Sequence, residues 1–304
     1  MTAAATVSAG CGCGELEFCP ECFGVDADAY VLEDLPAEDY HADPCPVAPS
    51  LSQTIATEIE QRSALHGWAL HPRLGGGAKP ATQAKDDGNL VHRLLLGKGA
   101  DLCAIDANDF RGLKARAQRD AAREAGQIPI LQKKLDEASG AVEHIRERLA
   151  NEGVSFDAGD TELSILWRSD TAEGPVWCRA RLDAVQGRVI YDLKKSRDAH
   201  PDQAAKAVVT YGYDIQHAAY TEALERGRPE LAGAVDFVFV FVELEPPYAV
   251  QVARLDGVFE QVGRARWGRA KEKWARCLRE KQWPGYRSSL LEAPLWFLRK
   301  EGVE

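Results

Sequence analysis

The sequence predicts an α/β protein, and two stretches carry that prediction. Residues 177–196, WCRARLDAVQGRVIYDLKKS, alternate with period two on both sides of Gln186-Gly187-Arg188, as a β-hairpin does. Residues 236–244, DFVFVFVEL, form an almost wholly apolar run typical of a buried strand. Stretches at about 202–225 and 256–281 have helical character, so strands and helices alternate through this half of the chain.

The hairpin places acidic residues close together. A two-residue loop at Gly187-Arg188 pairs Gln186 with Val189, and this register puts Asp183 directly opposite Asp192. Opposed carboxylates repel each other unless a cation lies between them, and carboxylate oxygens suit Mg²⁺ or Mn²⁺. Lys194 shares the face of Asp192, where it can orient a water or stabilise charge. The alternative is a surface hairpin with a solvated acidic pair.

The charge is distributed unevenly along the 304 residues, whose net charge is -10. Residues 1–60 hold twelve acidic residues and no Lys or Arg, so the rest of the chain is nearly neutral. Residues 264–299 hold ten Lys or Arg and three Glu, which suits a phosphate backbone or, alternatively, a solvated helix face. No apolar run of about 18 residues and no secretory signal is present, so we expect a cytoplasmic protein with no membrane partner.

Residues 1–49 are predicted to be an acidic tail, and residues 50–304 to be one domain. The tail holds four closely spaced cysteines, Cys11, Cys13, Cys19 and Cys22. Their spacing is compatible with a small structural Zn²⁺ site, although Cys-Gly-Cys is tighter than usual, and unliganded cysteines are the alternative.

Several helices are predicted ahead of the hairpin. One covers about 50–71 with Ser50 or Ser52 as N-cap, and a buried one begins at Asn89 after an exposed loop over 72–87. His92 lies in this second helix, either as a core histidine or as a ligand. Residues 109–150 are predicted to form two helices broken at Gly126–Pro129.

Two further elements frame the hairpin. Residues 162–167 are a strand candidate in which Glu162 faces away from the more apolar positions. On the helix at 202–225, Tyr213, Gln216 and Tyr220 project from one side. An apolar seam with hydrogen-bonded tyrosines is the alternative to a functional face.

The order of these residues resembles the PD-(D/E)XK nuclease superfamily, in particular the RecE-like and lambda-type phage exonucleases that share a nuclease module with RecB. The resemblance covers about residues 50–286. Its motifs match His92 in GNLVHRLLL, Asp183 in RARLDAV, Asp192 and Lys194 in YDLKK, and Gln216 and Tyr220 in QHAAY, and Glu162 matches an acid on the preceding strand. The resemblance implies a central mixed β-sheet flanked by helices, with a restriction-endonuclease-like core.

The resemblance also implies an activity and a set of roles. One or two Mg²⁺ or Mn²⁺ ions would be held by His92, Asp183, Asp192 and the main-chain carbonyl of Leu193. Lys194 would position the attacking water or neutralise developing charge, Gln216 and Tyr220 would contact the scissile phosphate or a metal-bound water, and Glu162 would be an acid at a second metal or beside the metal ligands. The substrate would be the end of double-stranded DNA, degraded 5′ to 3′ to leave a 3′ overhang for a single-strand annealing protein. The protein would form a homo-oligomeric ring, a trimer or tetramer, in a bacterial host cell.

Two alternatives remain open: a structure- or sequence-specific endonuclease of the same superfamily, and a non-catalytic DNA-binding recombination accessory protein. The chain departs from iron-sulfur members of the superfamily, because Cys277 is the lone cysteine of the C-terminal region, so we expect no such cluster. Trp68, His71 and Arg73 are speculative sites for a base wedge or an end-phosphate contact, with core packing of Trp68 as the alternative.

Overall fold

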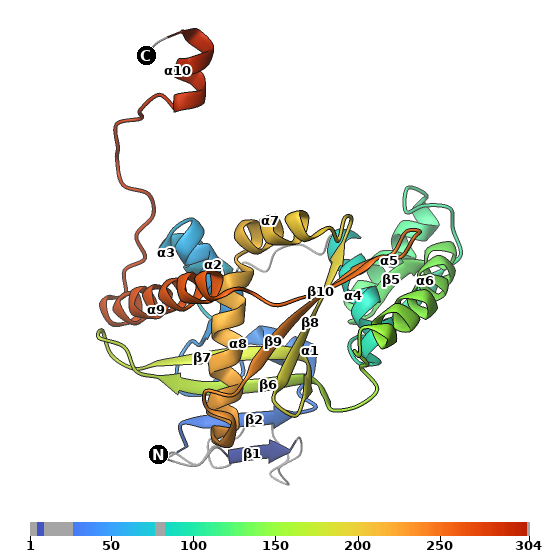
Figure 1. Ribbon diagram of the computed structural model, residues 1–304, viewed down its shortest axis with the longest axis horizontal. Coiled ribbons are helices and arrows are strands. Elements are labelled where there is room, and N and C mark those ends of the chain that lie inside the picture. The colour runs from blue at the N-terminus through green and yellow to red at the C-terminus, as the bar shows by residue number, and fades with distance from the viewer. Residues whose placement is uncertain (1–4, 9–26, 77–82, 303–304) are drawn as a thin grey trace.

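A mixed sheet with helices on both faces forms the centre of the computed structural model, which describes residues 5–8, 27–76 and 83–302 (Figure 1). Its strands, in spatial order, are β1 (Ala5–Ser8), β2 (Ala29–Glu33), β6 (Asp160–Ser169), β7 (Val176–Gln186), β8 (Val189–Ser196), β9 (Asp236–Glu243) and β10 (Val250–Ala253). The short strand β3 (Leu51–Ser52) pairs with β7 outside this order. The predicted fold class is therefore confirmed.

The sheet combines two kinds of pairing. Strands β6, β7 and β8 form an antiparallel meander, whereas β8 and β9 are parallel and need a crossover between them. That crossover is made by helices α7 (Pro201–Tyr211) and α8 (Tyr213–Gly227). The predicted hairpin register is confirmed, because Gln186 pairs with Val189 and Ala184 with Tyr191.

Helix α8 covers one face of the sheet and is covered in turn by α9 (Gly257–Glu280) (Figure 1). Beside α9 lie α2 (Gln53–Gln61) and α3 (Ala64–Leu70). The core here is built from fully buried residues of strands and helices, among them Trp167, Ile215 and Phe239. Such large apolar side chains supply the main driving force that fixes α8 against the strands.

The single helix predicted over 202–225 is wrong, because Gly212 separates α7 from α8. Gly212 has a φ of +70°, and a Cβ atom there would lie 2.7 Å from the Thr57 side chain. A glycine therefore fits this break where other residues would be strained. The helix predicted over 50–71 is likewise divided, since Ser52 and Ser63 accept hydrogen bonds from Ile55 N and His66 N as separate N-caps.

The opposite face is covered by α4 (Gln83–Leu96) and α6 (Gln132–Asn151). Helix α4 begins six residues before the predicted start at Asn89, so part of the expected loop is helical. The predicted break at Gly126–Pro129 is present between α5 (Leu113–Glu124) and α6. It contains a strand that the sequence did not reveal, β5 (Ile128–Leu131), which pairs in parallel with β4 (Leu102–Ile105).

Residues 27–49 do not form the tail expected from their acidic composition. Strand β2 pairs with β6, and all of Ala29, Tyr30, Val31 and Leu32 are buried. Helix α1 (Ala37–Ala42) follows and buries Tyr40. The apolar run is only four residues long and buries both of its faces, so it shows neither alternation nor helical periodicity.

Most basic residues of α9 are matched by acids elsewhere in the fold. Glu60 pairs with Arg269 and Lys273, and Glu173 pairs with Arg276 and Arg279. Each of these glutamates is shared by two cations, so the charge of the helix is offset only in part, and a basic surface for phosphate along 264–299 stays a prediction.

The chain ends in α10 (Leu295–Glu301), which stands away from the body (Figure 1). Across the described helices, none has the length and apolar character that crossing a membrane would require.

Candidate active site

Three strands bring three acidic residues into one row. The pairs on either side of Glu162, Thr161 with Ala184 and Leu163 with Leu182, set Glu162 opposite Asp183. The β7–β8 register then sets Asp183 opposite Asp192, but the paired residues end at Ala184 and Tyr191. The ladder is thus interrupted at the acidic row. Glu162 also has a φ of +57°, a strained value for a non-glycine residue of the kind that clusters at functional sites.

The Asp183 carboxylate occupies the gap between β7 and β8. Its Oδ2 accepts a hydrogen bond of 2.8 Å from the backbone N–H of Leu193. Its Oδ1 lies 3.7 Å from Nδ1 of His92. One oxygen therefore fixes the side chain to the neighbouring strand, and the other faces the imidazole.

His92 reaches this row from α4 on the opposite face of the sheet. Its Nε2 lies 3.1 Å from the Leu193 carbonyl oxygen, a distance that suits an N–H donating to that carbonyl. In that tautomer Nδ1 carries a lone pair and faces the acids, 3.7 Å from Asp183 and 4.0 Å from Glu162. The core-histidine alternative does not describe this placement, because the side chain is 28% exposed.

His92, Glu162 and Asp183 can together hold a metal ion. One ligand atom from each residue lies within 4.8 Å of the other two. Burial, only partly offset by His92 and reinforced by the charge of Asp192, raises the pKa of Asp183 to about 6. A carboxylate whose charge is so poorly compensated fits a cation, so the donor set suits the divalent metal that PD-(D/E)XK folds imply.

Asp192 and Lys194 form the other half of the site. Asp192 is 1% exposed, and its Oδ2 lies 2.5 Å from Nζ of Lys194. This ion pair compensates the charge of Asp192, and Asp192 in turn holds the ammonium in place. The Lys194 ammonium lies 4.6 Å from the ring centroid of Tyr213, within cation–π distance.

Helix α8 supports Asp192 from behind. Gln216 donates a hydrogen bond of 2.6 Å from Nε2 to Oδ1 of Asp192, and both side chains are buried. Tyr220 is 7% exposed and packs against Phe237. Burial raises the pKa of the Tyr220 phenol well above its usual value. The predicted common side of Tyr213, Gln216 and Tyr220 is therefore the side of α8 that faces Asp192 and Lys194. Gln216 and Tyr220 lie beneath the acids.

Arg181 belongs to the site and was not among the predicted residues. Its Nε donates to Oε2 of Glu162, and its Nη1 donates to the Leu35 carbonyl at 2.7 Å. The guanidinium therefore joins Glu162 to the N-terminal segment. Period two along β7 already put Arg181 on the face of Asp183, which was the available signal.

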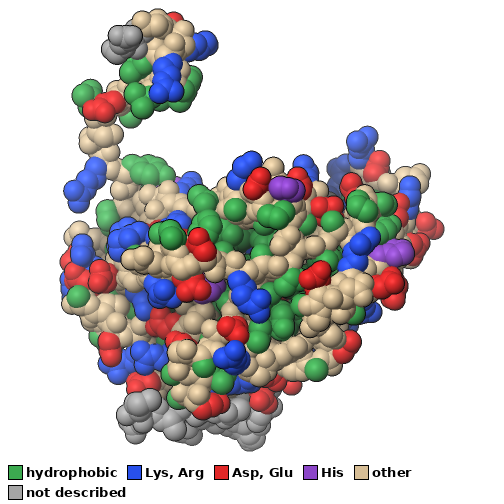
Figure 2. All heavy atoms as spheres, in the orientation of Figure 1, with side chains coloured by type: hydrophobic (Ala, Val, Ile, Leu, Met, Phe, Trp, Pro, Cys, Tyr) green, Lys and Arg blue, Asp and Glu red, His purple; other side chains and the backbone are tan. Residues whose placement is uncertain are grey.

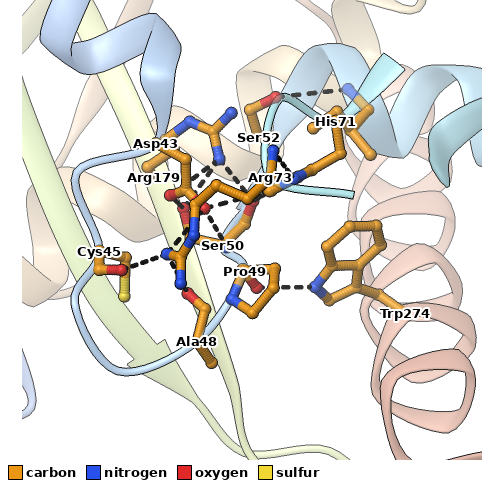
Figure 3. Close-up of polar contacts among 11 residues, drawn as sticks. Asp43, Cys45, Ala48, Pro49, Ser50, Ser52, His71, Arg73, Arg179 and Trp274 are labelled. Carbon is orange, nitrogen blue, oxygen red and sulfur yellow. Dashed lines mark hydrogen bonds and ion pairs between the residues drawn. The ribbon is translucent and has the colours of Figure 1, made fainter. Parts of the chain in front are cut away.

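The speculative DNA contact at His71 is corrected by a network around the buried Asp43, to which the partly exposed Arg73 also belongs (Figure 3). His71 is 0% exposed, and its Nε2 lies 3.2 Å from Asp43 Oδ2. Arg73 lies 3.3 Å from the same oxygen, and Arg179 lies 3.3 Å from Oδ1. Ser50 donates to Asp43 from both its N–H and its hydroxyl. These contacts hold the segment before β3 in place, and the burial of His71 leaves it no surface for a ligand.

The possible zinc ligands Cys11, Cys13, Cys19 and Cys22 lie outside the described residues.

One protein-family model matches most of this chain. A family model described as a PDDEXK-like domain of unknown function (DUF3799) matches residues 80–291. The chain belongs to this family. The match contains every residue of the acidic row together with His92, Lys194 and Gln216, and the superfamily predicted from the sequence is confirmed.

One solved structure has the same fold, and a second was also found as similar. A candidate exonuclease from Eubacterium rectale is similar over 88% of this chain and 97% of its own, with 14% identity and a TM-score of 0.54. A phage-related exonuclease from Haemophilus somnus 129PT is similar over 77% and 97%, with 15% identity and a TM-score of 0.30. The first likeness supports the fold of this PDDEXK-like domain. A comparison with curated proteins gave no match.

Proposed function

We propose that this PDDEXK-like protein is a metal-dependent exodeoxyribonuclease that hydrolyses phosphodiester bonds at the ends of linear duplex DNA. The observation that carries the proposal is the placement of His92, Glu162 and Asp183 around one point, next to the buried pair of Asp192 and Lys194. Acids, an imidazole and a lysine in this order suit phosphodiester hydrolysis.

The metal would be held by His92 Nδ1, Glu162 and Asp183, with Asp192 as a further ligand. A divalent ion such as Mg²⁺ or Mn²⁺ supplies Lewis acidity and lowers the pKa of an attacking water. Leu193 contributes twice, because its N–H orients Asp183 and its carbonyl oxygen orients His92. That carbonyl, predicted as a ligand itself, is proposed to fix the imidazole as well.

Lys194 is proposed to act as a fixed positive charge. Burial alone would lower its pKa, but the charges of Asp192 and Asp183 raise the pKa above its ordinary value. The ammonium therefore stays protonated at neutral pH and suits stabilisation of the charge that develops on the phosphate. This favours charge stabilisation over proton abstraction as the role of Lys194.

Gln216, Tyr220 and Arg181 are proposed to position the acids. Gln216 fixes the orientation of Asp192, and Tyr220 lies next to Gln216 one helical turn along α8. Arg181 fixes Glu162 in its strained conformation. These residues replace mobile solvent by fixed dipoles and charges around the metal ligands.

The action on DNA ends is proposed from the family resemblance and from the Eubacterium rectale structure, which is described as a candidate exonuclease. We propose 5′-to-3′ digestion that leaves a 3′ overhang for a single-strand annealing protein. A ring of three or four copies would let a protein of net charge -10 hold DNA in a locally positive channel.

Incubation with end-labelled linear duplex, in Mg²⁺ or in EDTA, tests the proposal. We expect digestion in Mg²⁺ alone, release of the 5′ label first, and no cleavage of closed circular duplex. Cleavage of the closed circle would support a structure- or sequence-specific endonuclease. Binding without digestion in Mg²⁺ or Mn²⁺ would support a non-catalytic accessory protein.

A further inference from the structure

An exposed aromatic ring lies close to the catalytic lysine. Tyr211 is the last residue of α7 and is 61% exposed. Its ring centroid lies 5.6 Å from that of Tyr213, and the Tyr213 centroid lies 4.6 Å from Nζ of Lys194. A single side chain thus separates the exposed ring from the charge that marks the position of the scissile phosphate.

The two tyrosines have different environments. Tyr213 stacks on Phe239 at 5.8 Å and belongs to the apolar core under α8. Tyr211 ends α7 just before Gly212 and is exposed, as is Val209, which is 59% exposed. Core packing therefore explains Tyr213 but leaves most of the Tyr211 ring in solvent.

The backbone that carries Tyr211 is held in place. Gln61 donates from Nε2 to the carbonyl oxygens of Val209 and Thr210, at 3.3 Å each, and the left-handed Gly212 fixes the turn into α8. A ring on an anchored backbone loses little conformational entropy when a ligand stacks on it.

The surface between α7 and the sheet is apolar in part. Figure 2 shows hydrophobic side chains gathered between α7 and the strands beneath it. A hollow of about 420 Å³ lies there, lined by Ala204 and Val208 of α7, by Phe239, Phe241 and Val252 of the sheet, and by the polar Gln251, Arg254 and Asp256; Tyr211 lies outside this lining, three residues after Val208 on α7. Such surroundings suit the flat face of a base better than a phosphate group.

We propose that Tyr211 is a stacking platform for an unpaired nucleobase beside the scissile phosphate. The inference rests on the proposed nuclease function and deepens it by naming the form of the substrate. Successive nucleotides of a duplex strand rise by about 3.4 Å along the helix axis, so a base a few nucleotides from the bond at Lys194 can reach Tyr211. A base stacked on a protein ring has left its own stack, so the strand enters the site with its terminal bases unpaired.

The test compares Tyr211→Ala, Tyr211→Phe and the control Tyr286→Ala on end-labelled linear duplex. Tyr286 is also exposed and lies against the ring of His66 on α3. Because one base–aromatic stack is worth a five- to 150-fold change, we expect Tyr211→Ala to raise KM by about that factor with kcat little changed. Tyr211→Phe and Tyr286→Ala should behave like the wild type.

An abasic nucleotide separates stacking from a structural role. Placed at successive positions near the end, one abasic nucleotide should raise KM for the wild type at one position and leave Tyr211→Ala unaffected there. An unchanged KM for Tyr211→Ala, or a loss that persists undiminished at every abasic position, would overturn the inference.

A binding measurement in EDTA distinguishes failure of this inference from failure of the nuclease proposal. A fluorescent purine analogue near the end of the DNA should be quenched when the wild-type protein binds, and the quenching should be lost in Tyr211→Ala. Absence of digestion with this quenching intact would contradict the nuclease proposal alone. Digestion without any quenching by the wild type would contradict the stacking role alone.

Discussion

Two buried carboxylates of this protein differ in how their charge is compensated. Burial alone would raise the pKa of Asp43, but hydrogen bonds from His71 and Ser50 and the charge of Arg179 lower the pKa overall. Burial raises the pKa of Asp183 to about 6, because His92 offsets it only in part and Asp192 adds a like charge. Both side chains are largely removed from water, so burial itself does not separate them.

This contrast separates a structural cluster from the candidate active site. Asp43 has more donors than its two oxygens require, so the network closes on itself and stabilises the fold. Asp192 is compensated by Gln216 and Lys194, whereas Asp183 has Leu193 N–H on one oxygen and His92 at 3.7 Å from the other, an imbalance that a cation would correct. The two clusters contain the same residue types, and the balance of charge around each carboxylate distinguishes one cluster from the other.

The largest effect is expected when the fixed charge of the site is removed. Lys194→Ala should lower the rate of Mg²⁺-dependent digestion by about 10²- to 10³-fold, the loss seen when one donor to a developing charge is deleted. Lys195→Ala is the matched control. Lys195 lies on the same strand as Lys194, but it pairs with Asp87 of α4 at 3.3 Å. Digestion at an unchanged rate by Lys194→Ala, measured with end-labelled duplex, would remove Lys194 from the mechanism.

A mutation in the Asp43 network should lower the stability of the folded protein. Asp43→Ala leaves Arg179 buried without its carboxylate and should lower the free energy of unfolding by about 3–5 kcal/mol. The exposed pair of Asp34 and Lys98 provides the control, and Asp34→Ala should cost less than about 1 kcal/mol. Denaturant unfolding measures both. A loss for Asp43→Ala no greater than for Asp34→Ala would show that the network is not structural.

Removal of the helix support should have an intermediate effect on activity. Gln216→Ala deletes the donor to Asp192 Oδ1 and should lower metal affinity or activity by about 10- to 100-fold. Gln216→Glu, of equal size, tests the role of the donor because a second carboxylate would repel Asp192. Rates for both variants equal to the wild-type rate would mean that Asp192 needs no positioning from α8.

The pH dependence should be the smallest of these effects near neutrality. Asp183 must be ionised to hold a cation, and its pKa is about 6 in the folded protein. Activity should therefore be nearly constant above pH 7 and fall by about tenfold per unit well below pH 6. A profile of kcat/KM measured in Mg²⁺ checks this, and a constant rate down to pH 4 would contradict the assignment.

Local pattern predicted the hairpin, its register and the outward face of Glu162, because these depend on residues close in sequence. It also placed Arg181 beside Asp183 without indicating its pairing with Glu162. The order of motifs led to His92 and Gln216, whose contacts with Leu193 and Asp192 join segments far apart in the chain.

The remaining features depend on tertiary contacts. The break at Gly212 is favoured by the close approach of Thr57, and β2 is a strand because β6 offers it an edge. The basic residues of α9 find Glu60 and Glu173 only once the chain is folded. Neither the composition nor the periodicity of the sequence identifies these partners.

The stability of Asp183→Asn, with and without metal, measures whether the acidic row is a metal site. Without metal, the raised pKa means that ionised Asp183 destabilises the folded state above pH 6. The stability is greatest when the group is protonated, and it falls as pH rises from about 4 to 6. Asn keeps the acceptor for Leu193 N–H without the charge, so the variant should be more stable at pH 7 by about 2–3 kcal/mol.

Metal should reverse this order. With Mn²⁺ at about 1,000 times its Kd, the wild type gains about 4 kcal/mol, whereas the variant lacks a ligand and gains little. Free energies of unfolding at pH 7 should therefore favour Asp183→Asn in EDTA and the wild type in Mn²⁺. The same order in both conditions would contradict the claim that the acidic row is a metal site.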